Sequence, residues 1–276
     1  MKNKLSCKMV AFGAWGQNFH NWQDLSALLN GGDAEVDAIV GPKPDVIPAN
    51  ERRRAPLPVR LAVESSWQAT QAAGIDPKEL SCVFVSGLGD TQLTDYMCKV
   101  LATDNKQLSP TKFHNSVHNA AAGYWTISTG CMKAANSVAG FAESVPLTLL
   151  EAITQCVHEQ VPVLLTFYDA PSSTILQDLL HNELPFSASI IIAPQGSDYS
   201  GLTLEASVEA TAAAWPSLKE PSLQVCYGSN PAARILPLLE MMATREKQTH
   251  LDESNASMTI PLSAESSIRI TLKNQV

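Results

Sequence analysis

The stretch SPTKFHNSVHNAAAGYWTISTGCMKAANSVAGFAESVPLTLLEA, residues 109–152, decides the fold of this chain. SVHNAAAGYW at 116–125 predicts a helix, and the short apolar run NSVAGF at 136–141 predicts a buried strand. Apolar residues at helical spacing then predict a second helix over 145–159. A buried strand between two helices predicts an α/β fold.

The segments on both sides continue this alternation. The expected strands are 6–14, 82–86, 161–167, 187–194, 202–210 and 267–273, and the expected helices are 22–30, 59–73, 91–102 and 231–245. The turn QGSDYSG between the fourth and fifth strands predicts a hairpin, hence an antiparallel edge on an otherwise parallel sheet. Residues 41–58 carry five prolines and are expected to form a surface loop, whereas 246–257 is polar and is expected to be mobile.

The same stretch resembles the nucleophile region of the β-ketoacyl synthases. In that family S-P and then S-[IV]-x-N-x-x-A-G precede a buried strand and a sharp strand-to-helix turn that carries the reactive cysteine. The residues that fall in this frame without a gap are Ser109, Pro110, Asn119, Ala122, Gly123, Gly130, Ser137, Val138, Glu151 and Ala152. The cysteine position is occupied by Ala142, followed by Glu143. Because a methyl group cannot attack a thioester, the resemblance implies a chain without its family's nucleophile.

The other catalytic residues of the family are missing as well. A complete ketosynthase contains two similar halves, and the second supplies two histidines from the motifs H-G-T-G-T and N-x-F-G-F-G-G. The resemblance covers roughly residues 5–210, and only 66 residues follow Ala210. Neither motif is present, and His250 in a polar segment is the only later histidine. We therefore expect one half of a thiolase-like fold, a mixed sheet covered by helices, in residues 1–210, with a helix and strand extension in 211–276 packing on the same domain.

The resemblance implies a non-catalytic chain-length-factor-like subunit of bacterial polyketide or aryl polyene biosynthesis. Its partners would be a cognate β-ketoacyl synthase, as a heterodimer, and an acyl carrier protein through that complex. Ketosynthase dimers place the segment matching 109–119 across the two-fold axis, where it lines the acyl tunnel of the other subunit. The residues expected at this tunnel and interface are Lys112, Phe113, His114, His118 and Asn119. Lys112 departs from the large apolar gate residue of many fatty-acid ketosynthases, so a simple apolar plug is not expected.

Two other functions remain open. The chain could be an acyltransferase or decarboxylase that uses Cys131, in the loop before the predicted strand, or Glu143 in a rearranged site. It could also be an interaction module without an acyl ligand. His114 and His118 are four residues apart and would share one helical face, the geometry of a zinc pair, but no H-E-x-x-H context surrounds them. FVSGLGD at 84–90 lacks the third glycine of a dinucleotide-binding motif, so no metal and no cofactor is expected.

Composition and charge exclude several further classes. The chain has 276 residues, 45% apolar and 17% charged, which suits a soluble globular protein. Its net charge of −8 argues against nucleic acid or an anionic membrane as partner, and ERRR at 51–54 is the only basic cluster. That cluster is either a solvated loop or a docking point for an acidic carrier protein. Six unpatterned cysteines and the lack of an apolar run of about 20 residues predict a cytoplasmic protein.

Overall fold

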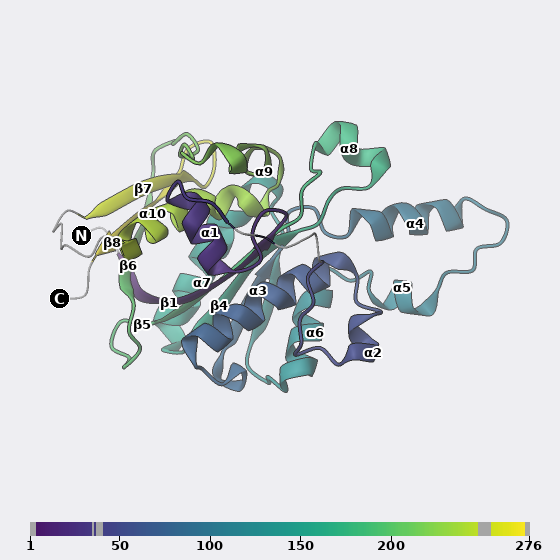
Figure 1. Cartoon of the computed structure of the whole chain (residues 1–276), viewed down its shortest axis with the longest axis horizontal. Coiled ribbons are helices and arrows are strands. Elements are labelled where there is room, and N and C mark those ends of the chain that lie inside the picture. The colour runs from purple at the N-terminus through teal and green to yellow at the C-terminus, as the bar shows by residue number, and fades with distance from the viewer. Residues whose placement is uncertain (1–3, 35, 37–40, 248–254, 274–276) are drawn as a thin grey trace.

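The computed structural model describes residues 4–34, 36, 41–247 and 255–273, which form an eight-stranded mixed sheet covered by helices (Figure 1). The strands lie in the order β3-β2-β4-β5-β1-β6-β8-β7. Their bounds are β1 Leu5–Gly16, β2 Ser81–Val85, β3 Ala135–Val138, β4 Val163–Asp169, β5 Phe186–Pro194, β6 Leu202–Glu209, β7 Ala256–Pro261 and β8 Ser267–Lys273. β3, β2 and β4 are parallel, and every other pair is antiparallel. The predicted α/β class, with a mixed sheet covered by helices, is confirmed.

Helices cover the sheet on both faces. The α-helices are α1 Trp22–Leu29, α2 Ala49–Arg52, α3 Leu57–Ala73, α4 Thr91–Leu101, α5 Pro110–His114, α6 Ala120–Thr129, α7 Ser144–Glu159, α8 Thr174–Leu180, α9 Gln224–Ser229 and α10 Leu236–Lys247. Short 3-10 helices are η1 Pro77–Glu79, η2 Phe141–Glu143, η3 Pro221–Leu223 and η4 Ala232–Ile235. Alternate residues of one strand point to opposite faces, so Leu164 packs in the cluster with α3 and α6, and Leu165 in the cluster with α1, α7 and α10.

The predicted hairpin between 187–194 and 202–210 is wrong, because β1 lies between β5 and β6 and pairs with both. The seven residues between them therefore cross the end of β1 instead of making a turn. A Cβ at Gly201 would lie only 1.9 Å from the Met9 backbone oxygen, so this crossing requires glycine. Lys8 holds the loop in place, with its Nζ donating to the backbone oxygens of Ser197 (2.6 Å) and Tyr199 (3.0 Å).

One further element prediction needs correction, and another can be compared with the structure only at its two ends. The strand expected to be buried at 136–141 is β3, which is the exposed edge strand of the sheet and ends at Val138. The segment 246–257, expected to be mobile, contains the last residues of α10 and the start of strand β7, which pairs with β8. The rest of that segment, 248–254, lies outside the described residues, and so does His250.

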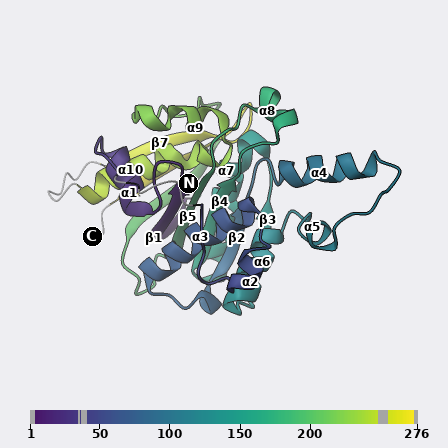
Figure 2. The same cartoon turned by 45° about the vertical axis from the view of Figure 1, so that its right-hand side comes forward.

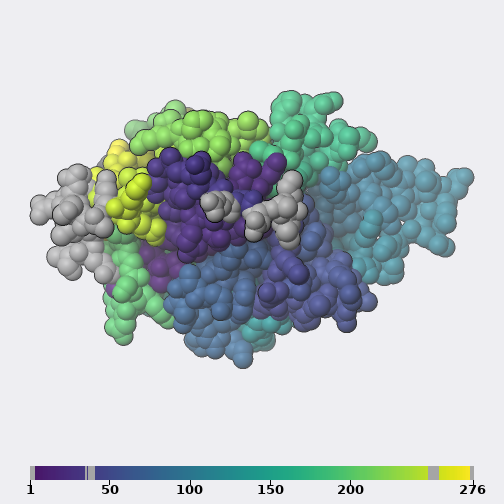
Figure 3. Space-filling view, in the orientation of Figure 1, coloured from purple at the N-terminus to yellow at the C-terminus, as the bar shows by residue number. Residues whose placement is uncertain are grey.

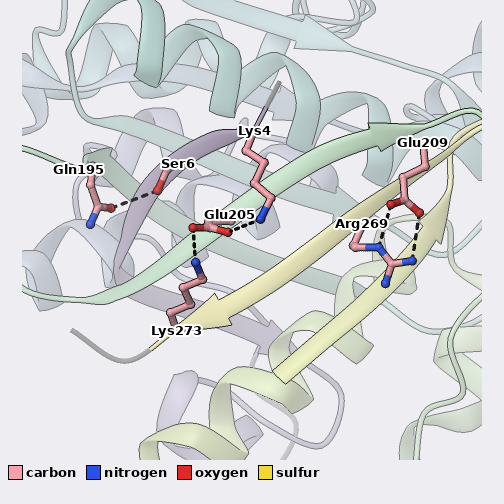
Figure 4. Close-up of polar contacts among 7 residues, drawn as sticks. All are labelled: Lys4, Ser6, Gln195, Glu205, Glu209, Arg269 and Lys273. Atoms are coloured by element: carbon pink, nitrogen blue, oxygen red, sulfur yellow. Dashed lines mark hydrogen bonds and ion pairs between the residues drawn. The ribbon is translucent and has the colours of Figure 1, made fainter. Parts of the chain in front are cut away.

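The face of β1, β6 and β8 shown in Figure 4 is polar and is organised by ion pairs. Glu205 lies between two lysines, pairing with Lys273 and, at 3.1 Å, with Lys4. Hydrogen bonds from Lys273 and Lys4 lower the pKa of the Glu205 carboxyl. Arg269 makes a two-pronged pair with Glu209, Nε to Oε1 at 2.9 Å and Nη2 to Oε2 at 3.1 Å. Charged side chains thus cover a sheet face on which the opposite side is the apolar core.

Three helices extend from the other end of the molecule (Figures 1 and 2). α4 buries only Thr91 and Leu93, and neither α5 nor α8 has a buried residue. The space-filling view shows the α4–α5 segment protruding from the body (Figure 3). Helices of this kind are weakly stabilised by their own chain, since a helix in a protein depends mainly on packing of its apolar face.

Candidate functional site

The chain forms a sharp strand-to-helix turn at the predicted place. β3 ends at Val138, η2 spans Phe141–Glu143, and α7 starts at Ser144. Phe141 has φ 48°, a left-handed conformation that is uncommon for a residue with a side chain. Ser144 Oγ accepts from the Gly140 amide at 3.1 Å, and the Glu143 amide donates to the Gly140 carbonyl at 2.9 Å. Ala142, half-buried, therefore stands in a well-formed elbow that carries no nucleophile.

The turn after β2 packs directly against this elbow. A Cβ at Gly87 would lie 3.1 Å from the Phe141 carbonyl oxygen and 2.5 Å from Cβ of Pro231. Glycine at this position thus allows three segments that are far apart in the sequence to meet: the β2 turn, the elbow and the start of η4.

Asp169, the last residue of β4, joins the turn after β2 to the start of η4. Its fully buried carboxylate accepts from Ser86 Oγ at 2.6 Å and from the amides of Gly87, Leu88 and Ala232 at 3.0 to 3.1 Å. Burial raises the pKa of Asp169 to about 6, and the four hydrogen bonds oppose this shift. Sequence reasoning missed Asp169, because it follows a buried strand without a motif that marks it.

The predicted tunnel residues are all on the surface, but they do not form one cluster. Lys112 places its Nζ 3.5 Å from the ring centroid of Tyr96 in α4, and Phe113 and His114 are exposed on α5. His118 instead reaches the elbow strand, with Nε2 3.1 Å from the Val138 carbonyl oxygen. Asn119 is the N-cap residue of α6, without a side-chain cap hydrogen bond.

His114 and His118 do not share a helical face as expected. α5 ends at His114, and a turn separates it from α6, which begins only at Ala120. The helix predicted over 116–125 is therefore shorter at its start. The described residues contain no cluster of three or more histidine, cysteine, aspartate or glutamate side chains that could hold a metal ion.

Three hollows surround the turn between α5 and α6, and Asn115 lines all of them. The two larger ones have volumes of about 710 and 730 Å³, and the smallest about 180 Å³. The Asn115 side chain is 6% exposed, its Nδ2 donates to the Arg54 carbonyl at 3.3 Å, and its Oδ1 has no hydrogen-bond partner among the described residues. Asn115 lies inside the predicted segment, but no spacing in the sequence distinguished it from its neighbours.

Cys131 and Glu143 lie at opposite ends of β3, so they cannot act on one substrate atom. Cys131 is 3% exposed, and its Sγ donates to the Leu80 carbonyl at 3.3 Å. A hydrogen bond from the Cys82 thiol is the main cause that lowers the pKa of Cys131 to about 6. Glu143 is exposed beside Ala142.

Within the described part of the chain, no helix is long and apolar enough to cross a bilayer.

The family model described as "Beta-ketoacyl synthase, N-terminal domain" matches residues 20–257. No curated protein matches the chain.

Several solved structures share its fold. A chain from the complex of the ketosynthase ApeO with its chain length factor ApeC from Xenorhabdus doucetiae superposes with a TM-score of 0.67 at 17% identity, covering 97% of this chain and 99% of that one. The ishigamide ketosynthase/chain length factor gives a TM-score of 0.71 at 11% identity, with 98% and 100% covered. A type II polyketide ketosynthase complex with its acyl carrier protein, AntDE:AntF, gives 0.69 at 10%, with 100% of both chains covered. At these identities the likeness establishes the fold, and the match of the family model to most of the chain shows that this protein belongs to the family of the β-ketoacyl synthase N-terminal domain.

Proposed function

We propose that this protein is a non-catalytic, chain-length-factor-like subunit that forms a heterodimer with a β-ketoacyl-ACP synthase and shapes its acyl tunnel in polyene or polyketide biosynthesis. The observation that carries the proposal is Ala142 at the tip of an otherwise intact elbow. The turn keeps its left-handed residue and its hydrogen bonds, although the side chain that would need them for catalysis is a methyl group. Such a turn is useful for its shape, as part of a pocket wall or an interface.

The surface around the elbow supports a protein partner. β3 is an edge strand, so one row of its backbone groups faces no other strand among the described residues, and such edges pair readily with another chain. Of the eleven exposed large apolar side chains among the described residues, nine lie between Leu101 and Leu179. They lie in α4, α5, α6, α7 and α8, in the turns before and after α6, and in the elbow, and α4, α5 and α8 project at one end of the molecule (Figures 1 and 2). An apolar surface of this extent favours an interface over a solvent-exposed face.

The hollows next to this surface are suited to an acyl chain. The 710 Å³ hollow has an apolar wall of Val117, Ala120, Tyr124 and Ile127 and is also lined by His114 and Asn119. His118 lines the smallest hollow and Lys112 the remaining one, whereas Phe113 is exposed and lines none of the three. We assign Lys112, His114, His118 and Asn119 to the tunnel on this basis, and we assign Phe113 to the interface because its large apolar side chain is exposed.

An acyl carrier protein would reach this chain through the complex. Carrier docking has a candidate in the basic cluster of α2, where Arg53 and Arg54 are exposed beside the hollows that Arg54 lines. Arg54 also pairs with Glu51 at 3.5 Å, so Arg53 supplies the positive charge, unpaired among the described residues, that would favour an acidic partner on a chain with a net charge of −8.

The test is complex formation with a candidate synthase, and the chain offers a matched pair of variants. Ile127 on α6 is 82% exposed at the proposed interface, and Val225 on α9 is 66% exposed away from it. Co-expression should give a 1:1 complex that Ile127→Asp abolishes and Val225→Asp leaves intact, because only the first places a charge in an apolar interface. A stable monomer that ignores every candidate synthase, or equal effects of both variants, would refute the proposal.

A second candidate, an acyltransferase that uses Cys131, is favoured by the lowered pKa of its thiol. Its burial opposes this function, since a thioester must reach the sulfur. A thiol-reactive acyl mimic separates the two proposals. Labelling of exposed Cys98 alone fits the non-catalytic subunit, and labelling of Cys131 in a Cys98→Ser variant favours the enzyme.

A further inference from the structure

Cys82 and Cys131 form a pair of thiols that lies away from the elbow. Cys82 is in β2, and Cys131 follows Gly130, the left-handed residue that ends α6. Both sulfurs are hydrogen-bonded to the same Leu80 carbonyl oxygen, Cys131 at 3.3 Å and Cys82 at 3.5 Å. The Cys82 thiol is also the donor toward the Cys131 sulfur. Two cysteines 49 positions apart in sequence are thus brought to one carbonyl oxygen by the pairing of β2 with the segment before β3.

The two thiols have opposite acidities. The hydrogen bond from Cys82, with a smaller contribution from Lys133, lowers the pKa of Cys131 to about 6, so its thiol gives up the proton that it shares with the Leu80 carbonyl oxygen more readily than an ordinary thiol. The hydrogen bond to Cys131 and burial raise the pKa of Cys82, which keeps its proton. A thiolate with a protonated thiol beside it is the arrangement in which one sulfur is oxidised first and the other resolves it.

The surroundings select a small oxidant. Cys131 is almost fully buried, yet both chain neighbours are exposed, and Met132 is 94% exposed. A peroxide molecule therefore needs only a small local opening of the 130–134 loop, whereas a bulky alkylating reagent or an acyl carrier needs much more. This difference in access also distinguishes the pair from a catalytic acyl-transfer site.

We propose that Cys131 and Cys82 are a peroxide-oxidised pair that closes into a disulfide between β2 and the loop leading to β3. The Cys131 thiol gives up its proton, its sulfur attacks one oxygen of hydrogen peroxide, and the O–O bond breaks as the sulfenic acid forms. The departing hydroxide takes up that proton and becomes water. The Cys82 sulfur then attacks the Cys131 sulfur, the S–O bond breaks, and water leaves with the proton of Cys82. Two thiols lose two electrons in total, and one peroxide is reduced to two waters.

The disulfide would link β2 covalently to the start of β3, the edge strand of the sheet. The Cys82 amide already donates to the Ala134 carbonyl at 2.8 Å, and Cys82 is in register with Ala135, the first residue of β3. A covalent link here ties the start of the edge strand to the buried strand β2. The inference does not depend on the proposed function, because it rests only on the two sulfurs and their common acceptor.

The experiment uses the full chain with Cys98→Ser, which removes the exposed thiol that would otherwise crosslink chains. Met132 next to Cys131 reports the peroxide dose, because its exposed thioether becomes a sulfoxide when oxidant is in excess. At peroxide levels that leave Met132 intact, we expect the loss of two hydrogen atoms by intact mass and one proteolytic peptide pair that joins Cys82 to Cys131. A reductant should reverse both changes, and a polyethylene glycol maleimide should not modify Cys131 in the untreated protein.

Two variants complete the test. Cys82→Ser in the Cys98→Ser chain should abolish the link and leave a Cys131 sulfenic acid that dimedone traps, and Cys156→Ser, another buried cysteine, should leave the link intact. A disulfide between any other pair overturns the proposal. So does a result in which Met132 is oxidised while both Cys82 and Cys131 in the Cys98→Ser chain stay as thiols, a measurement that needs no substitution in the pair itself.

Discussion

Gly201→Ala is expected to separate β1 from β6 and to lower the free energy of unfolding more than the same change at a glycine with free space around it. The added methyl carbon would lie 1.9 Å from the Met9 carbonyl oxygen, 2.7 Å from the Met9 carbonyl carbon and 3.2 Å from Cα of Val10. All three atoms are backbone, so no rotamer change can relieve the overlap. β1 and the start of β6 must move apart by more than about 1 Å, because Cβ atoms do not approach other heavy atoms within 3.0 Å.

The structure allows the cost to be estimated. The nearest register pair, Met9 with Leu202, is the first of five between these strands, and separation there removes ladder hydrogen bonds worth about 1 kcal/mol each. Overpacking adds about 1–3 kcal/mol. We therefore expect a loss of about 3–5 kcal/mol in the free energy of unfolding, or a Tm lower by roughly 6–20 °C for a chain of this size.

The assay is thermal and urea unfolding followed by circular dichroism, with Gly196→Ala as the control. Gly196 lies in the same loop, and a Cβ there would meet no atom within 4 Å. The control should stay within about 0.5 kcal/mol of the wild type. If Gly201→Ala unfolds within about 1 kcal/mol of Gly196→Ala, β1 does not pass as close to the start of β6 as described, and the strand order β5-β1-β6 is in doubt.

Three further predictions concern the site. Asp169 has a folded-state pKa of about 6 against an ordinary value of 3.8, so its carboxyl is more often protonated in the folded state. Its contribution to the free energy of unfolding should therefore decrease by up to about 3 kcal/mol as the pH rises from about 4 to 6. Across this range, the urea midpoint should fall more steeply for the wild type than for Asp169→Asn, and equal slopes would contradict the prediction. Ala142→Cys should give no condensing activity in the isolated chain, because the sequence contains neither of the histidine motifs that stabilise the thioester oxyanion. Turnover of a malonyl extender by this variant would show that a catalytic site was missed. Small and large substitutions at Lys112, Phe113 or His114 should change the ratio of longer to shorter products of the reconstituted complex severalfold, since each buried methylene contributes about 0.8 kcal/mol. Unchanged product masses with an intact complex would show that these residues do not line the tunnel.

The sequence predicted those parts of the fold that depend on local pattern. The strand, elbow and helix around Ala142 follow from a continuous stretch in which periodicity and glycine placement agree. The same local evidence failed for β3, because NSVAGF has the apolar character of an interior strand and nothing in it reports that no further strand lies beside it. Whether a strand lies at an edge is decided by the rest of the chain.

Long-range pairing explains the other errors. QGSDYSG has the residues of a hairpin turn, and only the insertion of β1, almost two hundred residues earlier, makes it a crossing. Likewise, Asp169 with Ser86 and Cys82 with Cys131 are brought together by the parallel register of β2, β3 and β4. Such pairs carry no spacing signature, because the distance between them in sequence is filled by helices and loops of arbitrary length.

The two ends of the sheet have opposite consequences for assembly. At the β3 end, the unpaired strand edge and the exposed apolar side chains would favour association with another chain. Toward the β7 end, β7 finishes at Pro261, which has no amide to donate, and the lysine, arginine and glutamate pairs of β6 and β8 cover the neighbouring face with fixed charge. A chain with two equally adhesive edges would add copies without limit and grow into a fibre. If only the β3 edge pairs with a partner, as proposed, assembly is expected to stop at a closed pair, and the charged end would limit further growth of the sheet.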